Sequence, residues 1–202
     1  MRLLYILIIT AITLSSCGDA SRKDLLPRNT GSKGEIAVVA PDAVWKTSTG
    51  DTLSASMDQI MYGLPQDELI LKRVEIKESG FNDFFKTHRN ILKVEVHPEK
   101  KNAVQVRRDV YSRQQLYIVI SVQSLEELPS VLKSRIIDII TLFHQAEIDR
   151  LIERNKDFGS KSLNKEILDK TGLKLIMQDK FQVAVDVPGF LWLRLDQSKP
   201  LG

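Results

Sequence analysis

Hydrophobic residues recur along this chain at the two spacings that distinguish strands from helices. Residues 90–97 alternate between apolar and charged side chains, which predicts a strand with one buried face. Residues 115–123 are apolar through their centre, as in a strand that is buried on both faces. Residues 103–111 follow a charged turn and are expected to pair with 90–97 as an antiparallel hairpin. Further strands are expected at 35–40, 69–76, 173–177, 181–187 and 190–196.

The longest helical pattern begins at Ser124 and runs to about Asp157. Its apolar residues step by three and four, and Ser124 with Glu127 matches a capping box. Shorter helices are expected at 49–61, 81–87 and 162–171. Together these elements predict one α+β domain over residues 35–202, in which the helix at about 124–157 packs on a mostly antiparallel sheet.

The first 17 residues have the pattern of an export signal. Met1–Arg2 is positively charged, Leu3–Leu14 is an almost unbroken apolar run, and small residues precede Cys17. The run is too short to span a membrane, which takes ~20 apolar residues. Leu-Ser-Ser-Cys resembles the bacterial lipobox, in which the cysteine sulfur receives a diacylglyceryl group and the signal, here residues 1–16, is removed. The alternative is an ordinary secretory signal that happens to contain a cysteine.

Lipidation of Cys17 would hold the mature protein on a membrane. One acyl chain gives only reversible binding, whereas two or three give a durable anchor. Residues 17–34 are rich in Gly, Ser, Lys, Arg, Asp and Pro, which predicts a flexible tether between the lipid and the domain. The expected partner is therefore a lipid bilayer. We expect a bacterial envelope membrane, the outer membrane in particular, with the domain in the periplasm or at the cell surface.

The composition excludes several classes of function. The chain has 29 Lys and Arg against 26 Asp and Glu, a net charge of +3, so nucleic acid is not an expected partner. Cys17 is the only cysteine, and its lipidation removes disulfides, thiolate metal sites and cysteine nucleophiles from the mature chain. The sequence contains no glycine-rich phosphate loop, Gly-x-Ser-x-Gly elbow or His-Glu-x-x-His motif, and no cofactor or metal is expected.

A family resemblance is carried by five groups of residues. They are Leu26-Pro27 with Gly31 and Gly34-Glu35-Ile36, Trp45 with Gly50-Asp51, Gly63-Leu64-Pro65-Gln66-Asp67-Glu68, Lys86-Thr87-His88-Arg89-Asn90-Ile91-Leu92, and Phe190-Leu191-Trp192-Leu193-Arg194. On these residues the chain resembles a family of uncharacterised Bacteroidetes lipoproteins that share a domain of unknown function. Leu69 departs from the family pattern, in which proline is expected. The resemblance implies a domain that continues beyond this chain's end, and it carries over no catalytic residues because no activity is known for the family.

Two polar motifs form the candidate site. The first is Gln66, Asp67 and Glu68 in a loop, and the second is His88, Arg89 and Asn90 between a short helix and a strand. The functional interpretation joins them in one polar pocket. The structural interpretation assigns the second motif to helix capping and to hydrogen bonds that fix the start of the strand.

A basic excess lies in residues 86–113, which contain eight Lys or Arg against three acidic residues. This excess fits either a solvated surface or contact with anionic headgroups or an acidic glycan.

Two hypotheses follow for the function. We favour a non-catalytic envelope lipoprotein that binds a protein, glycan or lipid through an exposed patch of aromatic and charged residues. The alternative is a hydrolase that acts on an envelope glycan or polymer through loop carboxylates. That alternative requires at least two carboxylates, or one carboxylate and His88, to converge in one cleft. Its candidates are Asp42, Asp51, Asp67, Glu68 and His88.

Overall fold

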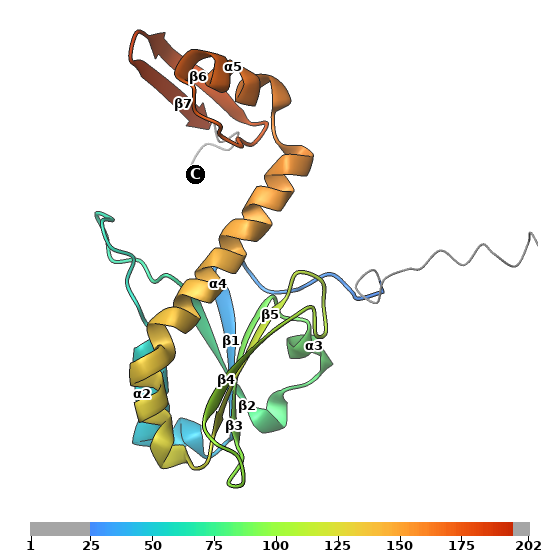
Figure 1. Cartoon of the computed structure of the whole chain (residues 1–202), viewed down its shortest axis with the longest axis vertical. Helices are drawn as coiled ribbons and strands as arrows, with labels where there is room; N and C mark the ends of the chain where they lie inside the picture. The colour runs from blue at the N-terminus through green and yellow to red at the C-terminus, as the bar shows by residue number, and fades with distance from the viewer. Residues whose placement is uncertain (1–24, 196–202) are drawn as a thin grey trace, which may run out of the picture. The chain divides into compact units, whose positions relative to one another are not determined.

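A computed structural model describes residues 25–195, so the predicted signal, Cys17 and the last seven residues lie outside the described part. The chain divides into two compact units with a boundary between Phe143 and His144. The long helix α4 (Leu128–Phe158) passes through this boundary (Figure 1). The interpretation of residues 35–202 as a single domain stays a prediction.

The first unit is built on a five-stranded mixed sheet with the order β2-β1-β3-β5-β4. β1 is parallel to both β2 and β3, β3 is parallel to β5, and β4 is antiparallel to β5. The strands are β1 (Glu35–Ala40), β2 (Lys72–Lys77), β3 (Asn90–Val96), β4 (Ala103–Arg108) and β5 (Leu116–Val122). Three of the four strand pairings are therefore parallel.

The α+β class and the long helix are confirmed, but the five-stranded sheet is mixed rather than mostly antiparallel. The predicted hairpin of 90–97 with 103–111 is not formed, because β5 lies between β3 and β4. β5 is buried at every position, as predicted, and it therefore occupies an interior place in the sheet. β4 carries Gln105, Arg107 and Arg108 and takes the edge, where polar strands are tolerated.

Helices cover both faces of the sheet (Figure 1). The helix α2 (Ser48–Met57) and the part of α4 before the unit boundary lie on one face, and the short helix α3 (Asp83–Lys86) lies on the other. Phe81 and Phe85 pack on this second face against buried sheet residues, which are Ala37, Val39, Ile76, Ile91, Tyr117 and Val119. Adjacent strand residues point to opposite faces, so Ile36, Val38 and their neighbours form the core under α2 and α4.

The chain changes direction across the sheet after β2. From β1 it passes through the 3-10 turn η1 (Val44–Lys46) and α2 to β2. It then passes through η2 (Glu78–Gly80) and α3 to β3, which lies on the opposite side of β1. In open α/β sheets ligands commonly bind at the carboxyl ends of the strands beside such a switch point. A ligand site in this fold is therefore expected at the carboxyl ends of β1 and β3.

Two predicted helix boundaries differ from the structure. α2 ends at Met57 rather than at residue 61, because the chain leaves the helix to enter a projecting loop. Ser124 forms no side-chain cap, and residues 125–127 adopt a 3-10 turn, η3 (Leu125–Glu127), before α4 begins. The capping box is therefore not formed, although the helix that it was expected to start is present.

The second unit contains α5 (Lys161–Thr171) and an antiparallel hairpin of β6 (Phe181–Val187) and β7 (Phe190–Leu195). Ser160 caps α5 by accepting a hydrogen bond from the Leu163 amide, and Gly172 ends the helix in the left-handed conformation. The strand predicted at 173–177 is not formed. Met177 N donates instead to Asn164 Oδ1 at 2.8 Å, and Met177 O accepts from Ser160 N at 3.0 Å.

Candidate functional site

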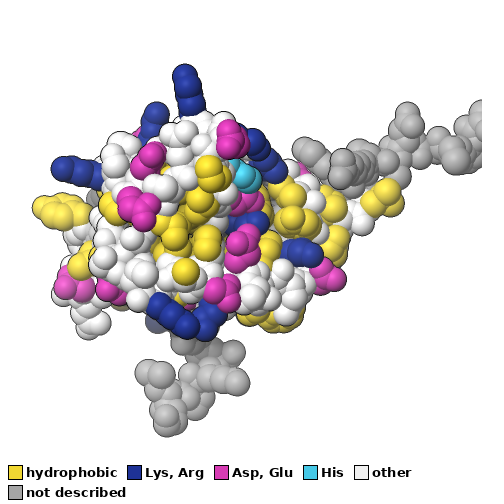
Figure 2. Space-filling model, turned by 90° about the horizontal axis from the view of Figure 1, so that it is seen from below, with side chains coloured by type: hydrophobic (Ala, Val, Ile, Leu, Met, Phe, Trp, Pro, Cys, Tyr) yellow, Lys and Arg dark blue, Asp and Glu magenta, His cyan; other side chains and the backbone are white. Residues whose placement is uncertain are grey.

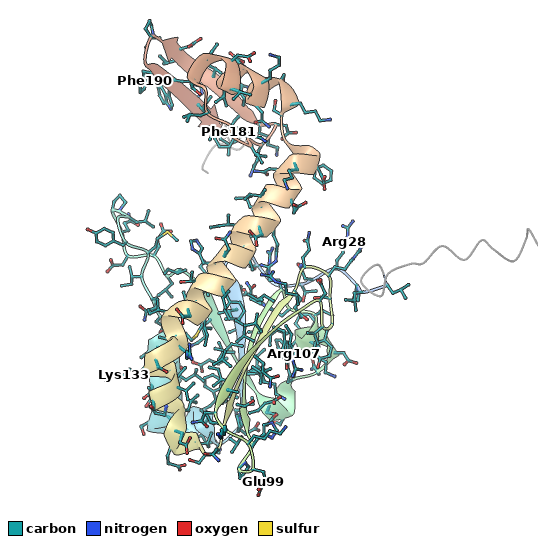
Figure 3. The ribbon with its side chains drawn as sticks, in the orientation of Figure 1. Arg28, Glu99, Arg107, Lys133, Phe181 and Phe190 are labelled. Carbon is teal, nitrogen blue, oxygen red and sulfur yellow. The ribbon has the colours of Figure 1, made fainter. Side chains whose placement is uncertain are left out.

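A segment before β1 lies against the amino ends of the strands. Thr30 N donates to Thr87 O, and Arg89 N donates to Thr30 O, both at 2.9 Å. Arg113 N donates to Pro27 O at 2.9 Å. Arg28, labelled in Figure 3, pairs with Arg113 in an isolated parallel β-bridge of the backbone. The sequence predicts a flexible tether as far as residue 34. The structure corrects this, since residues from Pro27 onward belong to the folded unit.

Five side chains form a polar cluster behind this segment, at the amino ends of β1, β3 and β5. Four of its members are among the six buried polar or charged residues of the described chain. The polar cluster consists of Glu35, His88, Asn90, Ser112 and Gln115. Burial of polar groups is tolerated only where their hydrogen bonds are satisfied, so the partners of each member decide its role.

His88 bonds through both ring nitrogens. Its Nε2 lies 2.8 Å from Glu35 Oε1, and its Nδ1 lies 2.9 Å from Asn90 O. Asn90 Nδ2 donates to Glu35 O at 2.9 Å, which ties the start of β3 to the start of β1. The hydrogen bond from His88 holds the pKa of the Glu35 carboxyl below its ordinary value.

Gln115 joins two segments of backbone, the one between α3 and β3 and the one between β4 and β5. Its Nε2 donates to both Lys86 O and His88 O at 2.7 Å, and its Oε1 accepts from Tyr111 N at 2.9 Å. Ser112 Oγ donates to Thr87 O at 3.0 Å. The side chains of the polar cluster thus bond to one another and to backbone. The hydrogen bonds of His88 and Asn90 fix the start of β3, as the structural interpretation of this motif expects. They lie at the amino ends of the strands, whereas ligands in such sheets usually bind at the carboxyl ends.

Gly31 is expected to be essential to this arrangement. Its φ is +87°, and a Cβ there would lie 2.3 Å from His88 Nε2. Gly63 has a φ of +88° but open space around its Cα, so Gly63→Ala measures the conformational strain alone. We expect Gly63→Ala to cost about 1 kcal/mol of unfolding free energy and Gly31→Ala at least ~1–2 kcal/mol more, from the added clash. Urea unfolding of both variants measures the difference, and equal losses would contradict the close packing on His88.

The Glu35–His88 pair is expected to make stability depend on acid pH. Because the pKa of Glu35 is lowered in the folded state from a value of 4.5, its ionised form stabilises the fold above that pH. The stabilisation is lost as the pH falls through the folded pKa. Wild type should therefore exceed Glu35→Gln in unfolding free energy at pH 7, and the gap should shrink as the pH falls below 4.5. Chemical unfolding across this range tests the sign, and a gap that grows on acidification would contradict it.

The other predicted motif lies on a loop that leaves the sheet between α2 and β2. This projecting loop, residues 58–70, is held at its base by Ile70 N donating to Gln59 O at 2.9 Å and by Met61 N donating to Glu68 O at 2.8 Å. Figure 1 shows it extending away from the sheet. Gln66, Asp67 and Glu68 are all exposed on it. No hydrogen bond or ion pair within residues 25–195 links His88 to Asp67 or Glu68, so the structure does not assemble the two motifs into one pocket.

The other carboxylates of the hydrolase hypothesis lie elsewhere. Asp51 is in the first turn of α2, which follows the carboxyl end of β1. His88 precedes the amino end of β3, one strand length away, or about 20 Å. Asp42 bonds to Ser79, accepting from its amide at 3.0 Å and from its hydroxyl at 2.5 Å. Asp51 and His88 therefore do not converge, and His88 instead meets Glu35.

A network that the sequence analysis missed lies at the carboxyl ends of the strands. Lys93 Nζ is 3.1 Å from Glu78 Oε1 and 3.0 Å from Glu95 Oε1. Glu95 Oε2 is 3.1 Å from His97 Nε2, and Glu78 is next to Ser79, the partner of Asp42. The alternation of Lys93, Glu95 and His97 on one face of β3 was the available signal. Only the strand order reveals that this face meets the end of β2.

The charges of this carboxyl-end network compensate one another. Burial alone would lower the pKa of Lys93, but hydrogen bonds to Glu95 and Glu78 raise it. Burial alone would raise the pKa of Glu95, but hydrogen bonds from Lys93 and His97 lower it. An amine held protonated and a carboxylate held ionised are poor proton-transfer groups near neutral pH. Figure 2, viewed from below onto the carboxyl ends, shows hydrophobic side chains with charged ones around them.

Neither a metal-binding cluster nor a membrane-spanning helix is found among the described residues. No group of three or more His, Cys, Asp or Glu between residues 25 and 195 is arranged to hold a metal ion. No helix in that same part of the chain is long and apolar enough to cross a membrane.

The first unit is a mixed α+β domain, and its buried polar cluster lies behind the segment that precedes β1. A family model described as "Domain of unknown function (DUF8532)" matches residues 29–156, more than half of the chain, and the chain therefore belongs to this family. The matched region begins at Asn29, in the segment that contacts the sheet, and includes both polar motifs. No curated protein and no solved structure matched the chain.

Proposed function

We propose that this protein is an exported lipoprotein, anchored in a bacterial envelope membrane through acylated Cys17, whose domain is a non-catalytic binding or structural module. The anchor rests on the lipobox-like Leu-Ser-Ser-Cys sequence after a charged start and a short apolar run. The outer membrane is the proposed location, with the domain in the periplasm or at the cell surface. The motifs around Gln66–Glu68 and Lys86–Leu92 support a place among Bacteroidetes lipoproteins.

One observation carries the non-catalytic part of the proposal. The side chains of the polar cluster are occupied by hydrogen bonds to one another and to the backbone. A general acid or base must reach a substrate proton, which a His88 at 5% exposure with both nitrogens occupied does not do. The cluster instead holds the membrane-side segment to the sheet. Pro27 is ten residues after Cys17, so the domain would stay within ~35 Å of the lipid.

The projecting loop supplies the proposed contact surface. Tyr62 is fully exposed on this loop, and Ile60, Leu64 and Leu69 are 52%, 41% and 44% exposed. Exposed apolar groups gathered with polar neighbours mark interaction sites on soluble domains. Asp67 and Glu68 provide those polar neighbours on the same loop. This is the kind of patch that a binding module requires.

Photocrosslinking in intact cells tests this proposal. A photoreactive phenylalanine analogue at position 62 should form a discrete adduct with an envelope component. The same residue at position 84, an exposed phenylalanine on α3, serves as the matched control and should form none. Absence of an adduct at position 62 under conditions where the protein is expressed and anchored would count against a binding role for the loop.

A further inference from the structure

Four of the five exposed cations of the basic stretch lie along one edge of the sheet, and the fifth, Arg113, lies in the loop between β4 and β5. Within residues 86–113, Lys93 is bonded to two glutamates and Lys86 to Asp83. Lys100, Lys101, Arg107 and Arg108 are exposed on β4 and on the turn before it. None of these four forms a salt bridge with a described carboxylate. We call these four residues the basic edge.

β4 is an edge strand with one free side. It pairs with β5 from Ala103 to Arg108 and is last in the strand order. The backbone groups on its outer side therefore have no strand beside them within the first unit. Such a row of free N–H and C=O groups is a template for an added strand.

A groove lies next to this edge, between β4 and the first half of α4. Its volume is about 460 Å³, and both elements belong to the first unit. Val104, Val131, Ile139 and Leu142 make its apolar part. Ser134, Arg135 and Asp138 are on its α4 side, and Asp138 is paired with Arg135. The groove is large enough for small apolar side chains, which an added strand would present at every second residue.

We propose that the basic edge and this groove bind an extended acidic polypeptide segment, which adds to the sheet beside β4. Main-chain hydrogen bonds to β4 supply the affinity, alternate small apolar side chains enter the groove, and Asp or Glu residues meet the four cations. Charge decides between this occupant and a second copy of the chain. Two β4 edges brought together would place eight cations along one seam, and like charges across strands destabilise pairing.

A matched set of peptides tests the proposal on the full chain purified in detergent. The probe is a fluorescein-labelled peptide of four Glu-Val repeats, with binding followed by fluorescence anisotropy. A Lys-Val peptide of equal length tests charge. A Glu-Val peptide N-methylated at two consecutive central residues keeps its charge but cannot pair along either edge. We expect binding of the first peptide only, with at least a tenfold loss for each control.

Variants of the protein locate the binding. Arg107→Glu with Arg108→Glu should weaken the Glu-Val peptide at least tenfold, and Ser134→Trp, which fills the groove, should do the same. Lys133→Trp is the matched control, because Lys133 is exposed on α4 but does not line the groove (Figure 3), and it should leave binding unchanged. Urea unfolding checks that each variant is folded.

Three results would overturn the inference. The N-methylated peptide binding as tightly as its parent would show attraction by charge without strand pairing. Unchanged binding to Ser134→Trp would remove the groove from the site. Binding of phosphatidylglycerol vesicles to the basic edge with no binding of the Glu-Val peptide would assign the surface to lipid. None of these outcomes depends on the projecting loop or on Cys17, so the proposed function is tested separately.

Discussion

Cys17→Ser is expected to abolish membrane anchoring. A serine hydroxyl lacks the thiolate nucleophilicity that lipid transfer needs, so the variant should receive no diacylglyceryl group and keep its signal. Residues 1–16 would remain on the chain, and no acyl chains would hold it in the bilayer. Metabolic labelling with an alkyne fatty acid should mark the wild type and leave the variant unmarked. Mass spectrometry of the intact chain then reports whether the signal is still attached.

Ser16→Ala is the matched control for this experiment. It changes the neighbouring residue but keeps a small side chain before the cysteine, so labelling and processing should persist. A Cys17→Ser protein that is cleaved normally and stays with the membrane fraction would refute the lipobox interpretation. That result would leave an ordinary secretory signal as the explanation.

Gln115→Ala is expected to be the most destabilising single change in the polar cluster. Gln115 is 1% exposed, and its amide serves two backbone carbonyls and one backbone amide. Truncation leaves Lys86 O, His88 O and Tyr111 N without these partners in a buried place. Each buried group left unsatisfied costs about 1–3 kcal/mol, and with partial rehydration we expect a loss of ~3–4 kcal/mol. Urea unfolding followed by circular dichroism measures it.

Gln66→Ala is the control for that loss. Gln66 belongs to the other polar motif and is exposed on the projecting loop, so its truncation should change stability by less than about 0.5 kcal/mol. A similar loss in the two variants would show that burial does not distinguish the motifs. A loss below ~1 kcal/mol for Gln115→Ala would show that its three hydrogen bonds contribute little to the fold.

The sequence predicted the elements better than their arrangement. Alternation in 90–97 and the apolar run in 115–123 identified β3 and β5, because the burial of a strand's side chains follows the order of consecutive residues. The order of the strands depends on which strand is at the edge of the sheet, with one side exposed to solvent. The polar residues of β4 indicated this edge, but proximity along the chain favoured a hairpin with 90–97, and the pairing with β5 replaced it.

The candidate site was predicted in part. His88 and Asn90 were identified with their structural interpretation, and the hydrogen bonds of the second motif fix the start of β3 as that interpretation states. Glu35 and Gln115, which bond to this motif from 53 and 27 residues away, were not predicted, since nothing local marks such partners. The segment from Pro27 was assigned to the tether for the same reason. Its composition is that of a linker, and only the contacts with residues 87–113 order it.

We infer that the polar cluster fastens the segment of residues 27–34 to the sheet. Native-state hydrogen exchange of the Thr30 and Arg113 amides tests this most directly, because they donate to Thr87 O and Pro27 O across the contact. We predict protection that approaches the free energy of global unfolding in the wild type and falls with Gln115→Ala. Exchange of these two amides as fast as that of Tyr62, in the exposed loop, would contradict the account.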